Sequence, residues 1–100
     1  MEPELLANAV TRLETLILRS TELTAEQITA ILGAVSEGSR LRHLDISYNW
    51  NGMSTVEPGL FVSAVIRLKT LDIVATRLSP EQAETIFAEA QRSSCLVKYR

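Results

Sequence analysis

Two aspartates and a histidine are the residues of this chain whose types and spacing could do chemistry. Asp45 and Asp72 stand 27 residues apart, at the same position of a repeated motif, and His43 lies two residues before Asp45. If the motif forms strands that pair side by side, the two carboxylates are cross-strand neighbours and the imidazole shares their face. Paired carboxylates with a histidine can bind a metal ion or act as an acid–base pair.

A simpler interpretation of these acids is favoured. Arg19 or Arg100 can compensate the paired negative charge, and an open sheet offers no pocket that excludes water. The sequence also contains no phosphate-cradling glycine loop, nucleophile elbow or metal-ligand spacing, and its single cysteine, Cys95, has no His/Cys cluster around it. We therefore expect no catalytic residue, no metal and no cofactor. The carboxylates are interpreted as an electrostatic contact for a basic patch on a protein partner.

Tyr48 and Trp50 are the strongest candidates for partner contact. They flank Asn49 and account for two of the five aromatic residues in the chain. Exposed aromatic side chains give a large contact area with a polar atom at one end, and they dominate binding hot spots. The alternative for Trp50 is local packing over the Asn51–Gly52 turn. The complete set of predicted partner-binding residues is Arg19, His43, Asp45, Ser47, Tyr48, Trp50, Asp72, Val74 and Arg77.

An internal repeat must position these residues. Aligning residues 1–45 with residues 56–100 at an offset of 55 gives 16 identical positions. A shorter period lies inside the long one, because Leu13, Leu41, Leu68 and Leu96 are spaced 28, 27 and 28 residues apart and each opens a similar motif. A period of 27–28 residues is typical of a solenoid, in which each repeat packs only on its neighbours.

Short parallel strands are expected at each motif. The spacing L-x-x-L-x-L-x-x-N/T occurs from Leu13, Leu41 and Leu68, and a fourth copy begins at Leu96. Its second and third apolar residues are two apart, so they share the buried face, and the residues between them face outward. The expected outward rows are Thr15, His43, Thr70 and Lys98; then Ile17, Asp45, Asp72 and Arg100; then Arg19, Ser47 and Val74.

Helices are expected between the strands. Thr24–Gln27 and Ser79–Gln82 have a capping-box pattern ahead of apolar residues at helical spacing. The helix of the second repeat should start near Ser54 or Thr55, with Pro58 in its first turn. Residues 3–11 should end a helix whose own strand is not included, so that the chain starts and stops within a repeat. The predicted divisions are 1–12, 13–40, 41–67, 68–95 and 96–100 of a single domain.

These motifs resemble the leucine-rich repeats of the ribonuclease-inhibitor type, which include the repeat domains of NOD-like receptors in innate immunity, and the resemblance covers essentially the whole chain. It implies an α/β right-handed solenoid, a segment of a horseshoe, with a parallel β-sheet on the concave face and helices on the convex face. It also implies binding of proteins through the concave strands and adjacent loops. Thr21 and Thr76 depart from the usual asparagine or cysteine, and a hydroxyl maintains only part of that residue's hydrogen bonds.

Composition indicates which classes of partner and which cellular compartment to expect. The formal charge of −2 lacks the basic excess that phosphate-backbone binding needs, so nucleic acid is not expected, and neither a polybasic patch nor an apolar span indicates a membrane. A lone cysteine and the absence of a signal peptide favour the cytoplasm.

Three functions follow for a chain of this kind. We expect a non-enzymatic protein-interaction module from a cytosolic sensor or adaptor of the NOD-like receptor type. One alternative is a GTPase-activating or enzyme-regulating domain in which Arg19 or Arg77 orders a partner's active site. The other is a structural spacer, which should self-associate through uncovered apolar ends.

Overall fold

A computed structural model describes residues 2–49 and 53–99. Strands and helices alternate along the chain. The elements in order are α1 (Pro3–Arg12), β1 (Thr15–Ile17), α2 (Ala25–Ser36), β2 (His43–Asp45), the 3-10 helix η1 (Met53–Thr55), α3 (Pro58–Val65), β3 (Thr70–Asp72), α4 (Pro80–Ser93) and β4 (Leu96–Lys98). The protein is therefore an α/β protein, as the sequence predicted.

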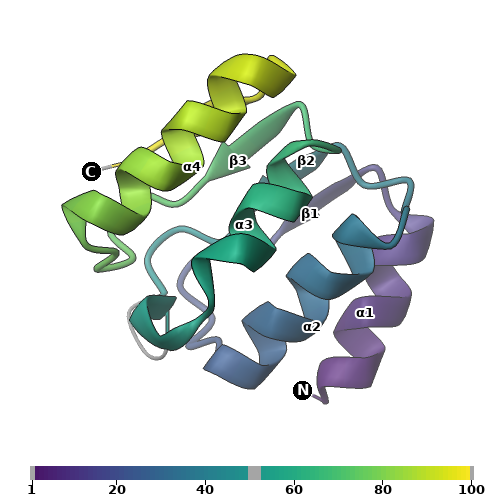
Figure 1. The fold of residues 1–100 in the computed structure, drawn as a ribbon. Coiled ribbons are helices and arrows are strands. Elements are labelled where there is room, and N and C mark those ends of the chain that lie inside the picture. Colours follow the sequence, from purple (N-terminus) through teal and green to yellow (C-terminus); the bar gives the residue numbers. More distant parts are fainter. Residues whose placement is uncertain (1, 50–52, 100) are drawn as a thin grey trace.

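The four strands form one parallel sheet whose order, β1-β2-β3-β4, is the order of the strands in the sequence. The helices lie together on one side of this sheet (Figure 1). Helix contacts likewise run between sequence neighbours, from α1 to α2, α2 to α3 and α3 to α4. Each new strand–helix unit is thus added beside the preceding one. Below, the outer sheet face means the face that the helices do not cover.

Local sequence signals set the helix starts. Thr24 accepts a hydrogen bond from the Gln27 amide while the Gln27 side chain accepts one from the Thr24 amide, and Ser79 and Gln82 repeat both bonds. These reciprocal bonds satisfy amides that have no partner inside a helix. Both predicted capping boxes are confirmed. Gly38 follows the end of helix α2 with a φ of +103°, a conformation that suits glycine.

The second repeat differs from its prediction. Its helix α3 begins at Pro58, with Glu57 as the N-cap, and not near Ser54 or Thr55. Residues Met53–Thr55 form the separate turn η1 instead. Proline fixes φ and lacks an amide proton, so it suits the first helical position better than a place deeper in the first turn. Helix α1 begins in the same way, at Pro3 after Glu2.

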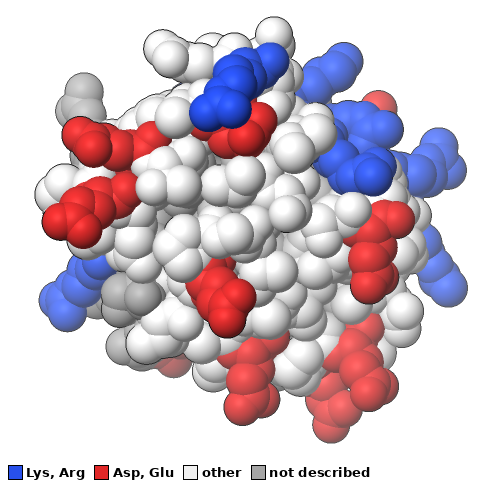
Figure 2. Space-filling view, in the orientation of Figure 1, with Lys and Arg blue, Asp and Glu red and all other residues white. Residues whose placement is uncertain are grey.

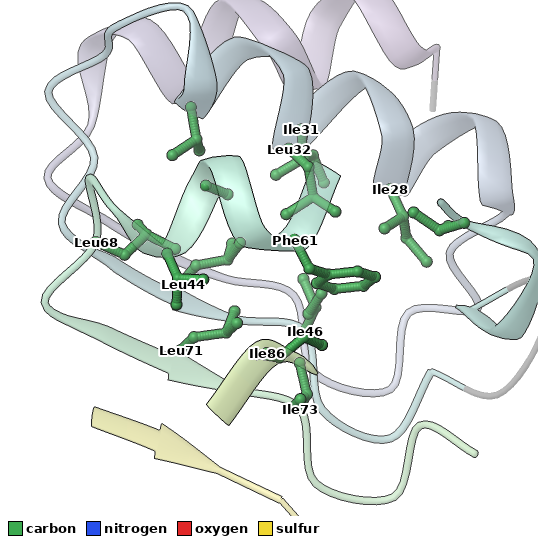
Figure 3. Close-up of a cluster of buried hydrophobic side chains, with 14 of the residues drawn as sticks. Ile28, Ile31, Leu32, Leu44, Ile46, Phe61, Leu68, Leu71, Ile73 and Ile86 are labelled. Atoms are coloured by element: carbon green, nitrogen blue, oxygen red, sulfur yellow. The ribbon is translucent and has the colours of Figure 1, made fainter. Parts of the chain in front are cut away.

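The core lies between the helices and the inner face of the sheet. Leu44, Ile46, Leu71 and Ile73 point from β2, β3 and the residues after them toward Phe61 and the apolar side of α2 (Figure 3). These are the second and third apolar positions of the predicted motif. The alternation along each strand therefore buries one row of side chains and leaves its neighbours on the outer sheet face.

The fourth strand is placed two residues earlier than the repeat predicts. Val97 pairs with Leu71, so Leu96 lies beside Thr70 and Lys98 beside Asp72. Helix α4 has 14 residues against 12 in α2, and the connection that follows it is shorter, which shifts the register. Leu96 consequently points outward and is 73% exposed, whereas Cys95 joins the core. The prediction that Leu96 opens a fourth motif like Leu41 is wrong.

Charge is distributed according to helix direction. In Figure 2 most acidic atoms lie along the lower and left margins, where the helices begin, and most basic atoms lie toward the upper right, where α1 and α2 end. Glu4, Glu26 and Glu81 occupy first turns, and Arg12 and Arg92 occupy last turns. This arrangement complements the helix dipoles. Across the described ranges, no helix is both long and apolar enough to span a bilayer.

Candidate binding face

The outer sheet face contains a shallow hollow of about 260 Å³. All four strands contribute to it. Its outward-facing lining residues are Thr15, Ile17, Arg19, His43, Asp45, Thr70, Asp72, Leu96 and Lys98. Polar groups thus occupy the middle of the hollow, on β2 and β3, and the exposed apolar side chains of Ile17 and Leu96 lie at its two sides, on β1 and β4.

Asp45 is the most strongly bound group in the hollow. Its Oδ1 accepts hydrogen bonds from the Ser47 hydroxyl at 2.6 Å and from the Ser47 amide at 3.0 Å. Its Oδ2 accepts one from Arg19 Nη2 at 3.0 Å, and Arg19 Nε donates to Ser47 Oγ at 3.2 Å. The Asp45 side chain is only 14% exposed. Partial burial acts to raise the pKa of Asp45, but the hydrogen bonds from Ser47 and Arg19 outweigh it and hold the pKa below its ordinary value.

Asp72 is the direct neighbour of Asp45 in the parallel register, as the sequence predicted. Its Oδ1 accepts the Val74 amide at 3.1 Å, and its Oδ2 lies 4.0 Å from Arg19 Nη2. One arginine therefore faces two carboxylates, and it is closer to the first. Lys98 stands beside Asp72 on the next strand. The prediction that Arg19 compensates the pair is confirmed, whereas Arg100, its predicted alternative, lies outside the described residues.

His43 belongs to a different contact from the two acids. Its Nδ1 lies 2.9 Å from Thr70 Oγ1 on the adjacent strand, one row away from Asp45 and Asp72. The next residues in this row are Thr15 on β1 and Leu96 on β4. The row therefore contains three polar residues and one leucine, and it carries no carboxylate. Searching the described residues for three or more His, Cys, Asp or Glu side chains grouped as metal ligands finds none.

The turns after the strands share an unusual backbone conformation. Ser20, Tyr48 and Ala75 occupy equivalent positions, and all three have φ between 55° and 57°. This left-handed region is costly for residues other than glycine. Two of the turns are tied to the segment that follows the next strand, because the Ser20 amide donates to Ser47 O and the Tyr48 amide donates to Val74 O. Tyr48 is held in this way at the margin of the outer sheet face with its ring exposed.

Asn49 connects the first two of these turns. Its buried side-chain amide donates to the carbonyls of Leu18, Ile46 and Ser47 and accepts the amides of Thr21 and Leu23. The threonines at the equivalent positions do less, as expected. Thr76 donates one hydrogen bond, to Ile73 O. Thr21 donates to Leu18 O and otherwise relies on Asn49.

The predicted partner-binding residues do not all lie together. Arg19, Asp45, Ser47 and Asp72 form one connected group, and His43 lies in the neighbouring row. Val74, Tyr48 and Arg77 follow at the ends of the strands, while Trp50 lies outside the described residues. Ser47 is fully buried, so it positions Asp45 and offers little surface of its own. The prediction omitted Leu96, because a leucine in a repeat was assigned to the core.

The arrangement can bind a cation or a hydrogen-bonding group at its centre and apolar groups at its sides. The Cys95 thiol lies outside the hollow, and burial raises its pKa to about 11, which keeps it in the unreactive protonated form at neutral pH. Compared with protein-family models, with curated proteins and with solved structures, the chain gives no match.

Proposed function

We propose that the chain is a non-enzymatic protein-interaction module, built as a right-handed leucine-rich-repeat solenoid, that binds a protein partner through its outer sheet face. A repeat period of 27–28 residues and a parallel sheet with its strands in sequence order support the architecture. Cytosolic sensors and adaptors of the NOD-like receptor type are the class to which we assign it, on the resemblance of its motifs.

The observation that carries this proposal is the pair of carboxylates, Asp45 and Asp72, in the hollow. Both carboxylates face the guanidinium of Arg19, and in the described part of the chain neither forms an ion pair with Lys98, the second cation that lines the hollow. Both are largely buried, with 14% and 18% of their side chains exposed. Hydrogen bonds from Ser47 and from the Val74 amide hold them in place before any ligand arrives. Groups fixed in advance lose little entropy on binding.

The residues that line the hollow indicate which kind of partner surface would bind there. A lysine or arginine side chain would meet Asp72, which Arg19 reaches only at 4.0 Å. Apolar side chains on either side of that cation would meet Ile17 and Leu96. Tyr48, exposed beyond the end of β2, adds an amphipathic ring at the margin. The partner is thus a protein surface with a basic residue between apolar ones.

The test is affinity capture from a cytosolic extract, followed by calorimetry with the captured protein once mass spectrometry has identified it. Asp45→Asn/Asp72→Asn keeps the side-chain shape and removes the charge, and Tyr48→Ala removes the ring. Each variant should weaken binding by about tenfold or more. The control Glu26→Gln/Glu84→Gln removes two exposed charges from α2 and α4, on the opposite side of the sheet, and should bind like the wild type.

Equal binding by all four proteins would contradict the assignment of the outer sheet face. Capture of no protein at all would favour the spacer interpretation. Circular dichroism on each variant checks that any loss reflects binding and not unfolding.

A further inference from the structure

The side of the molecule formed by α1 and β1 exposes apolar residues that the chain buries elsewhere. Leu13 is 41% exposed, whereas Leu68, its identical counterpart at the 55-residue offset, is 3% exposed. Leu5 is 60% exposed, and its counterpart Leu60 packs partly buried against the core. The difference arises because a preceding helix, α2, covers this side of α3, whereas in the described structure nothing covers the same side of α1.

The opposite side, formed by α4 and β4, also exposes an apolar residue whose counterpart is buried in the interior. Phe87 is 37% exposed and packs edge-on against Tyr99 at 5.9 Å, whereas its counterpart Leu32 on α2 is fully buried. A hollow of about 470 Å³, lined by Val74, Val97, Lys98 and Tyr99, opens beside β4. Within the described residues β1 and β4 are the edge strands of the sheet, so each has backbone groups on one side without a strand partner.

The two sides resemble the two halves of a contact that the chain already contains, although β4 is shifted by two residues from the place of β2 in the repeat. At the 55-residue offset, α1 corresponds to α3 and α4 corresponds to α2, including identical residues at positions such as Val10 and Val65 and Ile31 and Ile86. Helices α2 and α3 pack together inside the molecule, and β2 pairs with β3 beneath them. Contact of α4 with the α1 of another molecule would therefore bring together the counterparts of residues that already pack on each other.

We propose that this chain binds a second copy of itself head to tail, with the α4–β4 side of one molecule against the α1–β1 side of the next. The sheet then continues from β4 to β1 in parallel. If the register of the four described strands is extended by one more strand, Thr15 of the second copy lies beside Leu96 and Ile17 lies beside Lys98. The exposed Ile17 side chain would cover the aliphatic stem of the lysine.

A two-fold dimer is the competing arrangement. It would pair β1 with β1 or β4 with β4, and a two-fold axis between equivalent edge strands makes them antiparallel. All the strand pairs described in this chain are parallel. Inside the chain α3, the counterpart of α1, packs on α2 and α4, so a contact between two α1 helices has no example there. The head-to-tail contact repeats the packing of α2 on α3 and the parallel pairing of strands, and it leaves one free side at each end of any assembly.

The test uses two variants of the whole chain, each blocked on one side. Leu5→Lys/Ile17→Lys places charges on the α1–β1 side, and Phe87→Lys/Leu96→Lys places them on the α4–β4 side. The four side chains are among the exposed large hydrophobic residues, so the fold should persist, and circular dichroism verifies this. Ile17 and Leu96 also line the hollow, so these two variants are used for self-association only. Partner binding is judged separately with the Asp45, Asp72 and Tyr48 variants, so the two proposals can fail independently.

Sedimentation velocity at concentrations up to about 1 mM provides the readout. The wild type should show a weight-average mass that rises with concentration past two chains, and each variant alone should stay at the 11.1 kDa of one chain. An equimolar mixture of the two variants should form a species of two chains and nothing larger, because only one intact pair of sides remains.

Three results would each overturn the proposal. They are a wild type that remains a single chain throughout, a blocked variant that still dimerises alone, which indicates the two-fold arrangement, and a mixture that stays dissociated although the wild type associates.

Discussion

Gly33 and Gly38 lie five residues apart and have opposite effects on the stability of the same helix. Gly33 stands inside α2 with nothing within 4 Å of where a Cβ would be, so it costs backbone entropy without a steric need. Gly38 ends the helix at φ +103°, which few side chains tolerate.

Alanine at the two positions should therefore give opposite results. Gly33→Ala is expected to raise the free energy of unfolding by about 0.5–1 kcal/mol, and Gly38→Ala to lower it by about 1 kcal/mol or more. Urea denaturation followed by circular dichroism measures both. A loss of stability in Gly33→Ala would mean that α2 is packed more closely at this point than described.

Asp45 links stability to pH. The pKa of Asp45 is lowered from its ordinary 3.8 in the folded protein, so the carboxylate stabilises the fold at all pH values above 3.8 and loses this effect as pH falls through the lowered value. We expect the gap in unfolding free energy between wild type and Asp45→Asn to be constant from about pH 7 to pH 5 and to shrink below pH 3.8. Urea titrations at a series of pH values measure it.

The Ser47→Ala variant is the control for that titration. It removes the hydroxyl that donates to Asp45 at 2.6 Å, so the pKa of Asp45 in the folded variant is lowered less, and the loss of stability on acidification below pH 3.8 should be smaller than in the wild type. A gap between wild type and Asp45→Asn that widens toward low pH would have the wrong sign and would contradict the described hydrogen bonds.

At the scale of the element, the turns after the strands couple one strand–helix unit to the next. Asn49 from the second unit accepts the amides of Thr21 and Leu23 from the first. The capping boxes, by contrast, act within one helix each. Loss of Asn49 therefore affects the contact between two units, and loss of a cap affects one helix.

Replacing Asn49 with alanine should cost about 3 kcal/mol or more, because the buried Leu23 amide and Ile46 carbonyl lose their only described side-chain partner and the Leu18 carbonyl loses one of two. Thr76→Ala at the equivalent position should cost about 1 kcal/mol, since one hydrogen bond is lost. Chemical denaturation of the two variants side by side makes the comparison. Equal costs would show that the asparagine's additional bonds contribute nothing.

The sequence predicts some of the helix starts and strand positions and misses others. The capping boxes depend on residues three apart, so Thr24, Gln27, Ser79 and Gln82 identify two helix starts without tertiary information. The start of α3 and the register of β4 depend on competing local fits, in which Pro58 favours one position and the short connection between α4 and β4 shifts another. Identity between Leu41 and Leu96 gave the wrong role because it does not report the length of the connection that precedes the strand.

At the scale of the whole molecule, position decides what an identical residue contributes. Leu13 and Leu68 have the same place in the repeat, but one lies at the side of the molecule and the other in its interior. Position in the sheet also decided which residues of the candidate site could be predicted. Asp45 and Asp72 could be paired from the sequence because they come from interior strands, whereas Leu96 on the edge strand could not be assigned to the hollow.

Alanine at these two leucines should separate the contributions. Leu68→Ala is expected to cost about 3 kcal/mol, and Leu13→Ala about 1 kcal/mol, because the exposed side chain has less apolar area to lose. Thermal and urea unfolding at low protein concentration provide the values. Equal costs in dilute solution would mean that Leu13 is covered in a way that the described structure does not contain.

The succession of strands in sequence order has a consequence for how the chain reaches its structure. Helices contact only the preceding or following helix in the described pairs, and strands do the same, so contacting residues are separated by about one period along the chain. Because each such contact closes a loop of about one period, the entropy cost of adding a unit stays similar from one unit to the next. The α2–β2–α3 segment, which has neighbours on both sides, is where folding should nucleate, and the outer units would then add to it one after another.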